Sequence, residues 1–449
     1  MFEASPLSAE EIVRLCKQHS MFEWVAQSTV TPITMAKAKG VFFWDAHGKR
    51  YLDFNSQLMS VNIGHGDERV IRAIKEQADK LIYAGPMIAT EPRAVLGKML
   101  AEISPGDLNK AFFTLGGADS NENAIRIARL VTGRHKIIVR YRSYHGATAG
   151  AATLTGDPRR FGAEPGIPGV CRALDPYRYR CAFCQEKPAC TLQCLHHVEE
   201  VVQFEGPQNV AAIMMETVTG TNGIIIPPDG YLQGLRELCD RHGILLILDE
   251  VMSGFGRTGK WFAANHWNVV PDIMTIAKGL TSSYLPLGAV LMRDKVAAYF
   301  DNNVYYGGLT YNSHPMSCAA AIATLKVYVE DKLIENSERM GKVLARELDR
   351  IKERHPSVGE VRSIGLFSIL ELVKDRKARE PLAPYNARPD QMLVMNKLNG
   401  FLRENGVYTL IRWNNCFVNP PLCINEQQLL EGLAVIDRGL QITDEAVRA

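Results

Sequence analysis

The sequence contains Gly243-Ile-Leu-Leu-Ile-Leu-Asp249-Glu250 and, further along, Asp272-Ile-Met-Thr-Ile-Ala-Lys278-Gly279. Short aliphatic runs of this kind are typical of strands buried inside a parallel sheet. Functional sites in open α/β sheets lie outside the carboxyl ends of the strands. Because one run ends in an acid and the other in a lysine, we expect Asp249 and Lys278 to meet in one pocket.

A lysine and an acid in one such pocket are the pair that pyridoxal phosphate (PLP) requires. The amine forms a Schiff base with the cofactor, and the carboxylate keeps the pyridine nitrogen protonated so that the ring accepts electrons. Solvated lysines and acids are also common in loops beyond strand ends. On spacing alone, this second interpretation stays open.

Short apolar runs alternate with helical patterns on both sides of this pair. The alternation is typical of a mostly parallel sheet that helices cover on both faces. We expect strands at 110–114, 136–139, 210–216, 244–249, 273–277 and 287–291, and helices at 10–19, 68–82, 92–103 and 332–354.

The two ends of the chain follow a different pattern. Residues 40–44 and 50–54 predict a β-hairpin, and the regular alternation stops after about residue 325. We therefore expect a large α/β domain at 67–325, and a smaller α+β domain built from 1–66 and 326–449.

The composition is that of an ordinary globular protein. Lys plus Arg (51) balance Asp plus Glu (49), which argues against a nucleic-acid partner. The first residues lack the basic and apolar regions of a secretory signal, and no run of about 18 apolar residues could span a membrane. We expect a cytoplasmic protein without a membrane partner.

A third signal lies in Phe112-Phe-Thr-Leu-Gly116-Gly117-Ala118-Asp119-Ser120, where a strand ends and a helix begins. Glycines let the backbone approach an oxyanion, and the unpaired N–H groups of the first helical turn bind it. The run thus predicts a phosphate site. The alternative is an ordinary helix start that Asp119 or Ser120 caps, with glycines that serve only the turn.

Three further segments offer groups for a cofactor. In Ser143-Tyr144-His145-Gly146, which follows the strand at 136–139, Tyr144 offers an aromatic face for a pyridine ring. Glu216 ends another strand, and the loop Gly307-Gly-Leu-Thr310 offers a second phosphate contact. Taken alone, Tyr144 could be an ordinary core aromatic, and Glu216 and the loop of Thr310 could be ordinary loop residues. Their agreement favours a cofactor site.

Four of the ten cysteines lie in one short stretch. Thiolates at these spacings could close the tetrahedron of a structural zinc site, whereas reduced thiols or one incidental disulfide explain the same spacing. No catalytic metal is expected. The stretch contains Cys181, Cys184, Cys190 and Cys194.

With these residues in place, the chain resembles the class III aminotransferases, PLP enzymes of fold type I (aspartate aminotransferase-like). The likeness is strongest in Leu248-Asp-Glu-Val-x3-Phe-Gly-Arg-Thr-Gly259, in 271–279 and in Pro286-Leu-Gly288. It implies an α/β fold with a mostly parallel central sheet plus a smaller α+β domain from both termini. It also implies a homodimer or a dimer of dimers with active sites at the subunit interface.

The resemblance implies a role for each residue of the site. Lys278 would carry the Schiff base and Asp249 would pair with the pyridine nitrogen, while Val251 and Tyr144 would lie on the two faces of the ring. Thr310 would reach the phosphate bound in the neighbouring subunit. The implied cofactor-binding set is Gly117, Ala118, Tyr144, His145, Glu216, Asp249, Val251, Lys278 and Thr310.

For the substrate, the pattern is most similar to pyruvate-dependent ω-aminotransferases, including those that use taurine. Arg412 lies where such enzymes carry a mobile arginine for a carboxylate, although a surface arginine explains it equally simply. Leu58, Met59 and Tyr83 are expected to form an apolar wall. The implied reaction is ping-pong transfer of an amino group from an ω-amino acid, taurine or a primary amine to pyruvate. The alternative is another fold type I PLP enzyme, such as a decarboxylating transaminase or an aminomutase.

Overall fold

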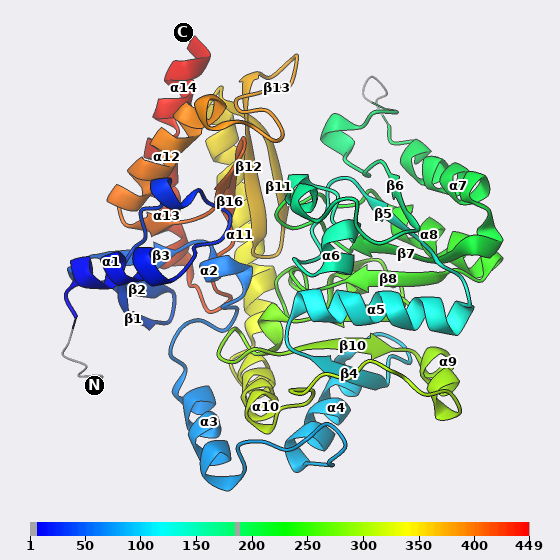
Figure 1. The fold of residues 1–449 in the computed structure, drawn as a ribbon. Coiled ribbons are helices and arrows are strands. Elements are labelled where there is room, and N and C mark those ends of the chain that lie inside the picture. The colour runs from blue at the N-terminus through cyan, green and yellow to red at the C-terminus, as the bar shows by residue number, and fades with distance from the viewer. Residues whose placement is uncertain (1–6, 185–188, 449) are drawn as a thin grey trace.

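A seven-stranded sheet forms the centre of the computed structural model, which describes residues 7–184 and 189–448 (Figure 1). The strand order is β4-β10-β9-β8-β7-β5-β6. Neighbours from β9 to β6 pair in parallel, whereas β10 runs antiparallel to both β4 and β9. Only β10 is therefore reversed, which confirms a mostly parallel sheet. The strands are β4 (Lys110–Thr114), β5 (Lys136–Arg140), β6 (Val170–Ala173), β7 (Val210–Glu216), β8 (Leu245–Asp249), β9 (Ile273–Ile276) and β10 (Gly288–Met292).

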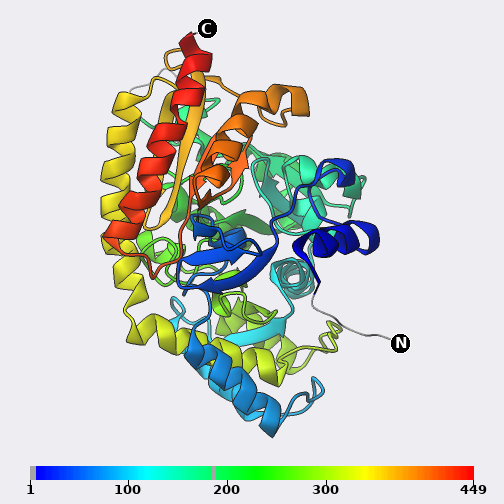
Figure 2. The ribbon, with the colours of Figure 1, turned by 90° about the vertical axis from the view of Figure 1, so that its left-hand side faces the viewer.

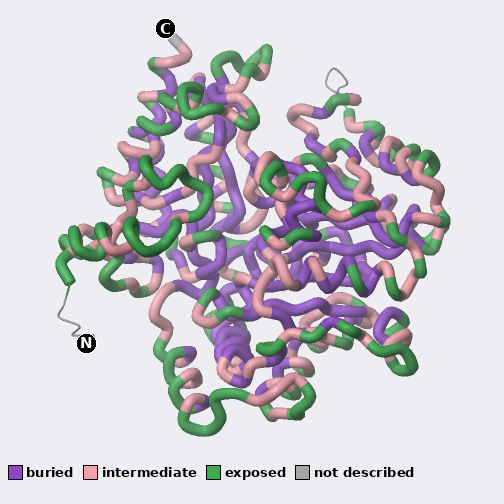
Figure 3. The backbone as a smooth tube through the Cα atoms, in the orientation of Figure 1, coloured by how far each residue is buried: buried purple, intermediate pink, exposed green. Residues whose placement is uncertain are grey.

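Two hydrophobic layers enclose this sheet. Helix α5 (Gly117–Thr132) covers one face, and Ile247 of β8 points into that layer. Leu248, the next residue, belongs to the opposite layer, to which α8 (Tyr231–His242) contributes. Figure 3 shows the central strands as a buried band. Coverage on both faces explains why these strands are uninterrupted apolar runs in the sequence.

The expected strands of the central sheet are confirmed to within one residue at either end, and the hairpin strands and the expected helices to within two. Strand β6 was not expected, because three of its four residues are only partly buried and no apolar run marks it. The reversed direction of β10 leaves no local sequence signal either. The four expected helices are α1 (Ala9–His19), α3 (Glu68–Lys80), α4 (Glu91–Ile103) and α11 (Leu333–Arg354).

Two smaller sheets lie beside the central one (Figures 1 and 2). In the first, the expected hairpin of β2 and β3 pairs with β1, and β14 from the far end of the chain adds in parallel to β3. The second has the order β11-β12-β16-β15, with β13 pairing to β12. The strands are β1 (Met35–Lys39), β2 (Phe42–Asp45), β3 (Arg50–Asp53), β11 (Val358–Ile364), β12 (Phe367–Asp375), β13 (Glu380–Pro381), β14 (Val407–Tyr408), β15 (Ile411–Arg412) and β16 (Asn415–Val418).

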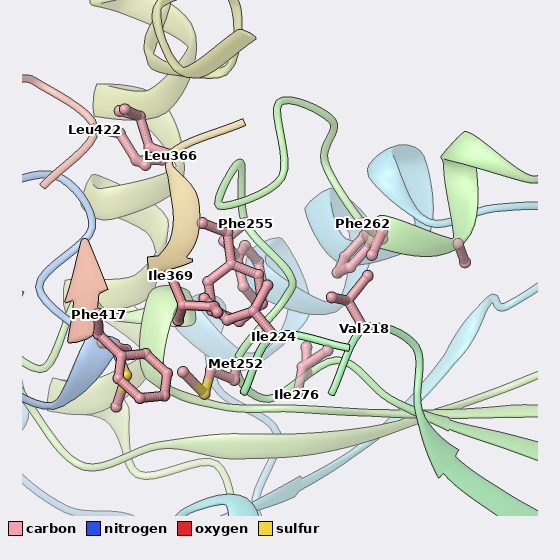
Figure 4. Close-up of a cluster of buried hydrophobic side chains, with 14 of the residues drawn as sticks. Val218, Ile224, Met252, Phe255, Phe262, Ile276, Leu366, Ile369, Phe417 and Leu422 are labelled. Atoms are coloured by element: carbon pink, nitrogen blue, oxygen red, sulfur yellow. The ribbon is translucent and has the colours of Figure 1, made fainter. Parts of the chain in front are cut away.

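A hydrophobic cluster joins the central sheet to the second of these sheets (Figure 4). Phe255, from the segment after β8, lies near Ile369 of β12, and Phe262 and Phe417 of β16 belong to the same cluster. All four side chains are fully buried. Burial of a large apolar side chain contributes roughly 1.5–3 kcal/mol, so this contact holds the two sheets in a fixed relation.

Arg257 reinforces the same junction with hydrogen bonds. Its side chain is wholly buried and donates to the carbonyl oxygens of Leu366 (3.0 Å) and Pro420 (2.6 Å). It also donates to Ser56 Oγ (3.1 Å) and Asn62 Oδ1 (2.9 Å). Burial lowers the pKa of the guanidinium to about 10. These bonds tie the loop at 56–62, which reaches the site, to both sheets.

The other helices complete the layers and connections. Among the described helices, none combines the length and the apolar character that crossing a bilayer demands. The remaining α-helices are α2 (Ser56–Met59), α6 (Ala149–Leu154), α7 (Gln193–Glu205), α9 (Asp294–Ala297), α10 (Pro315–Glu330), α12 (Leu393–Glu404), α13 (Glu426–Gly439) and α14 (Gln441–Arg448). The 3-10 helices are η1 (Gln27–Thr29), η2 (Pro158–Ala163), η3 (Arg178–Arg180), η4 (Pro207–Asn209), η5 (Ala263–His266), η6 (Lys278–Leu280), η7 (Ala298–Asp301) and η8 (Pro389–Met392).

Candidate active site

A cavity of about 500 Å³ opens at the carboxyl ends of the parallel strands. This volume lies within the range of small-molecule and cofactor sites. The cavity brings Asp249 and Lys278 together, as the sequence predicts. Its lining also includes Leu58, Met59, Gly117, Ala118, Tyr144, His145, Glu216 and Val251.

Asp249 ends β8 and lies in register with Glu216 on the neighbouring strand β7. Its Oδ2 atom is 2.7 Å from His145 Nδ1 and accepts a hydrogen bond from Asn121 Nδ2 (2.9 Å). Its Oδ1 atom accepts from the backbone N–H of Val251 (3.0 Å). Three partners hold this buried carboxylate in one orientation and stabilise its negative charge. An anion at this point can pair with a cationic ring nitrogen.

Lys278 follows β9 and begins the 3-10 helix η6. Burial lowers the pKa of its amine, and the negative charges of Asp249 and Glu216 oppose that shift. The lowered pKa favours the free amine, the form that reacts as a nucleophile or base. The backbone of Lys278 has φ 38°, a strained conformation of the kind found at functional sites.

The start of α5 lines the cavity with Gly116, Gly117 and Ala118, where the sequence predicts an oxyanion cradle. Gly116 is the N-cap and carries no side chain, whereas Ser120 Oγ bonds to the Gly116 carbonyl (2.9 Å) and to Thr114 Oγ1 (2.7 Å). The interpretation that Asp119 or Ser120 caps this helix is therefore wrong, because the Ser120 hydroxyl is engaged elsewhere and Asp119 makes no cap. A Cβ atom on Gly117 would lie 2.8 Å from Val251 Cγ1, so a larger residue here would force one of the two to move.

Glu216 acts on the segment that carries Tyr144. Its Oε1 atom accepts from the backbone N–H of Tyr144 (3.0 Å), and its Oε2 atom accepts from the N–H of Gly220 (2.7 Å). Burial raises the pKa of the Glu216 carboxyl, and the nearby charge of Asp249 adds to that shift. The carboxyl thus fixes the backbone from which the Tyr144 ring enters the cavity.

Two arginines converge on one carboxylate beside this ring. The Arg159 guanidinium carbon lies 3.5 Å from the centre of the Tyr144 ring, and its Nη2 atom donates to Thr221 Oγ1 (2.7 Å). Arg159 also pairs with Asp157, to which Arg412 Nη2 donates at 3.1 Å. Burial, together with the charge of Arg159, lowers the pKa of Arg412 to about 10. The Arg412 side chain is 20% exposed and is held by its ion pair with the buried Asp157, although Arg412 itself is not among the residues that line the cavity.

The apolar wall is only partly as expected. Leu58 and Met59 line the cavity, and Trp24 adds to the wall with its ring edge-on to Tyr144 (6.1 Å between centroids). Tyr83 is not among the lining residues; its hydroxyl donates to the carbonyl oxygen of Thr310 (2.9 Å). The role of Tyr83 in the apolar wall therefore stays a prediction, since its loop lies against the segment of Thr310.

Three residues of the site escaped the sequence analysis. Asn121 looks like an ordinary helical residue, and Trp24 lies far from the other site residues along the chain. The run Asp157-Pro-Arg159 does contain a local signal for Arg159. An acid two residues before an arginine at a helix start favours an ion pair between them. The position of that pair next to Tyr144 depends on the tertiary fold.

The cysteine stretch does not form a metal centre in the part of the chain that the structure describes. All ten cysteines are free thiols. Across 7–184 and 189–448, no group of three or more His, Cys, Asp or Glu side chains is arranged to hold a metal ion. The zinc interpretation of Cys181, Cys184, Cys190 and Cys194 is therefore not supported by the described residues, nor is the alternative of an incidental disulfide.

The residues of the cavity fit PLP. An acid suited to the ring nitrogen, an amine and the glycine-containing start of helix α5 all line one space of suitable volume. Fold and site together define a PLP-dependent enzyme of fold type I.

Comparison with known proteins gives the family. Residues 25–440 match the family described as aminotransferase class-III, and the chain belongs to this family. A solved structure of taurine:2-oxoglutarate aminotransferase from Bifidobacterium kashiwanohense, in complex with PLP and glutamate, is 42% identical with a TM-score of 0.94. That similarity covers 99% of this chain and 100% of the other. PLP is accordingly the cofactor of this aminotransferase.

Two curated relatives differ in the reaction that their names give. Leucine/methionine racemase from Thermococcus litoralis is 35% identical over 97% of this chain and 96% of its own length. Taurine–pyruvate aminotransferase from Bilophila wadsworthia is 32% identical over 97% of this chain and 98% of its own. The family is thus clear, whereas the substrate differs among its members.

Proposed function

We propose that this protein is an ω-aminotransferase that takes an amino group from a donor with a carboxylate or sulfonate at its far end and transfers it to pyruvate. The observation that carries the proposal is that Arg159, which lines the cofactor cavity, and Arg412 converge on the same buried carboxylate, Asp157. Arginine presents a planar set of donors that matches oxyanions. An ω-amino acid or taurine has such an anion, and so does a keto acid acceptor.

The chain's own residues perform the proton chemistry. PLP, when bound, supplies an electron sink for the carbon that bears the amino group. We assign the removal of the proton from that carbon to Lys278 Nζ, whose lowered pKa favours the free amine. Asp249 keeps the ring nitrogen cationic, and Tyr144 and Val251 hold the two faces of the ring. The amides of Gly117 and Ala118 bind the phosphate.

A ping-pong course follows from the single cavity. The donor and the acceptor both need Lys278 and the same arginines, so they bind in turn. The first half-reaction releases the oxidised donor, and the second returns the amino group to the keto acid. The printed function of the Bilophila wadsworthia relative supports pyruvate as acceptor.

Two alternatives each have a specific observation in their favour. The name of the 42% identical Bifidobacterium protein favours 2-oxoglutarate as acceptor. The racemase among the relatives favours PLP chemistry that moves a proton without moving the amino group. Both would use the same lysine and acid, so only products separate them.

We further propose that two chains form the working enzyme, with Thr310 reaching the phosphate bound in the partner. The loop around Thr310 supports this role, because it carries apolar side chains on the surface. Tyr306 is 86% exposed, and Met87 in a neighbouring loop is 96% exposed. Exposed apolar groups of this kind mark protein interfaces.

A donor–acceptor matrix on the purified holoenzyme tests the function. Taurine, β-alanine and propylamine would be paired with pyruvate and with 2-oxoglutarate, and alanine, glutamate and CO₂ would be measured. We expect alanine without CO₂, and a kcat/KM for the two anionic donors at least about tenfold above that for propylamine. Equal use of propylamine would contradict the anionic-donor proposal. Racemisation of leucine without any keto acid would favour the second alternative.

A further inference from the structure

Asp157 is the common partner of both arginines. It lies at the start of η2, and its carboxylate is completely buried. Arg159 binds it through Nε (3.0 Å to Oδ2) and through its backbone N–H (2.9 Å to Oδ1). Arg412 Nη2 and Asn222 Nδ2 share the same Oδ2 atom, at 3.1 Å and 3.0 Å.

The cluster holds more positive than negative charge. Asp157 carries one negative charge, and the two guanidinium groups carry two positive charges. The pKa of Asp157 stays lowered despite its burial, because both arginines stabilise the ionised form. Among the described residues, Arg412 Nε is buried without a hydrogen-bond partner. A buried donor without a partner is costly, so this cluster is suited to accept one further anion.

The two arginines are held very differently. Arg159 has several bonds to Asp157, one to Thr221 and a close stack on Tyr144. Arg412 has one hydrogen bond to Asp157 and a stack on Trp413 (4.2 Å to the ring centre). Arg412 can therefore leave Asp157 with the loss of one hydrogen bond, whereas Arg159 would lose several.

Asn222 allows Arg412 to leave Asp157 without depriving the buried carboxylate of its hydrogen bonds. When Arg412 leaves Oδ2, Asn222 Nδ2 and Arg159 still donate to Asp157. The carboxylate remains hydrogen-bonded and keeps one full counter-charge. A buried carboxylate that lost its last partner would instead cost several kcal/mol.

We propose that Asp157 is a specificity-determining positioning residue, an internal counter-ion that competes with the substrate anion for Arg412. With an uncharged amine, Arg412 stays on Asp157 and its charge is neutralised. With a carboxylate or sulfonate, Arg412 transfers to the substrate while Arg159 stays in place. This inference rests on the proposed function and adds the group that sets the balance between charged and neutral donors.

Asp157→Asn tests the competition in the holoenzyme, because asparagine keeps the shape and removes the charge. Isethionate, an unreactive sulfonate, would be titrated by calorimetry, and KM would be measured for β-alanine and propylamine. We expect isethionate to bind roughly tenfold more tightly than to the unchanged protein, since its competitor is gone. We expect KM for propylamine to rise by a similar factor, because Arg412 has lost its resting partner.

The two opposite shifts distinguish this role from a structural one. A variant that is merely damaged would lose affinity for both ligands and melt earlier. Asn222→Ala, which removes an uncharged partner of the same carboxylate, is the matched control and should change both values by the same small factor. Unchanged or weaker isethionate binding in folded Asp157→Asn would overturn the inference.

A second variant covers the case in which Asp157→Asn does not fold. Arg412→Ala should lower isethionate affinity at least roughly tenfold and raise KM for β-alanine more than KM for propylamine. Equal losses for both ligands would overturn the inference. Failure of the proposed function gives a different result, because the unchanged enzyme would then show no transamination with β-alanine or taurine while the isethionate titrations remain measurable.

Discussion

His145 Nδ1 lies 2.7 Å from Asp249 Oδ2, and both side chains are buried at the base of the cavity. With Asn121 Nδ2 on the same oxygen, the imidazole sets the direction in which the carboxylate faces the cavity. The acid that we assign to the ring nitrogen is thus itself held in place. Groups that orient a functional side chain often matter almost as much as the side chain.

This relationship predicts graded losses of rate. Asp249→Asn should reduce kcat by about 10²–10⁴, since each tenfold corresponds to ~1.4 kcal/mol of lost stabilisation. His145→Gln and Asn121→Ala should each reduce it less, by about tenfold, because the charge remains and only its orientation suffers. Steady-state kinetics with saturating PLP would measure these effects. A larger loss from Asn121→Ala than from Asp249→Asn would contradict the assigned order.

Lys278 gives a prediction for pH. Burial places its pKa below the ordinary lysine value of 10.5, so the free amine is present at lower pH than in an ordinary lysine. The rate at which apoprotein recombines with PLP should therefore rise with pH and level off below 10.5. Stopped-flow absorbance of the lysine-linked cofactor would follow the reaction. A profile that still rises at pH 10.5 would speak against the lowered pKa.

Two variants control this experiment. Lys278→Ala should fold, yet lose turnover and the absorption of the lysine-linked cofactor. Asp249→Asn removes the largest charge that raises the pKa of Lys278, so its profile should shift to lower pH. A shift toward higher pH would show that the two side chains do not interact as described.

Gly117→Ala should weaken the retention of PLP. The new Cβ atom would stand 2.8 Å from Val251 Cγ1, which forces the phosphate cradle or the valine to move. We expect the Kd for PLP to rise at least about tenfold in equilibrium dialysis. Adding Val251→Ala should restore part of the affinity, because it removes the atom in conflict. Gly97→Ala is the matched control, since a Cβ atom there meets no other atom within 4 Å.

The site residues that the sequence predicts are those at or just after the carboxyl ends of strands. Asp249, Glu216 and Lys278 were found because each ends or follows an apolar run, and neighbouring parallel strands bring such ends together. Arg159 was missed because nothing local indicates that its loop folds over Tyr144. The contact of Tyr83 with the Thr310 carbonyl oxygen has no local sequence signal either, since a loop's direction depends on packing between distant segments.

The last prediction concerns Thr310, whose side chain we place at the partner's phosphate. Thr310→Arg should inactivate the homodimer, and Lys278→Ala inactivates it for a separate reason. If Thr310 serves the partner, a mixed dimer of the two variants contains one site with both an intact lysine and an intact threonine. Random mixing of co-expressed chains should then restore about a quarter of the unchanged activity. If Thr310 served its own chain, every mixed site would lack one of the two groups and activity would stay at the background, which is the outcome that would remove Thr310 from the interface.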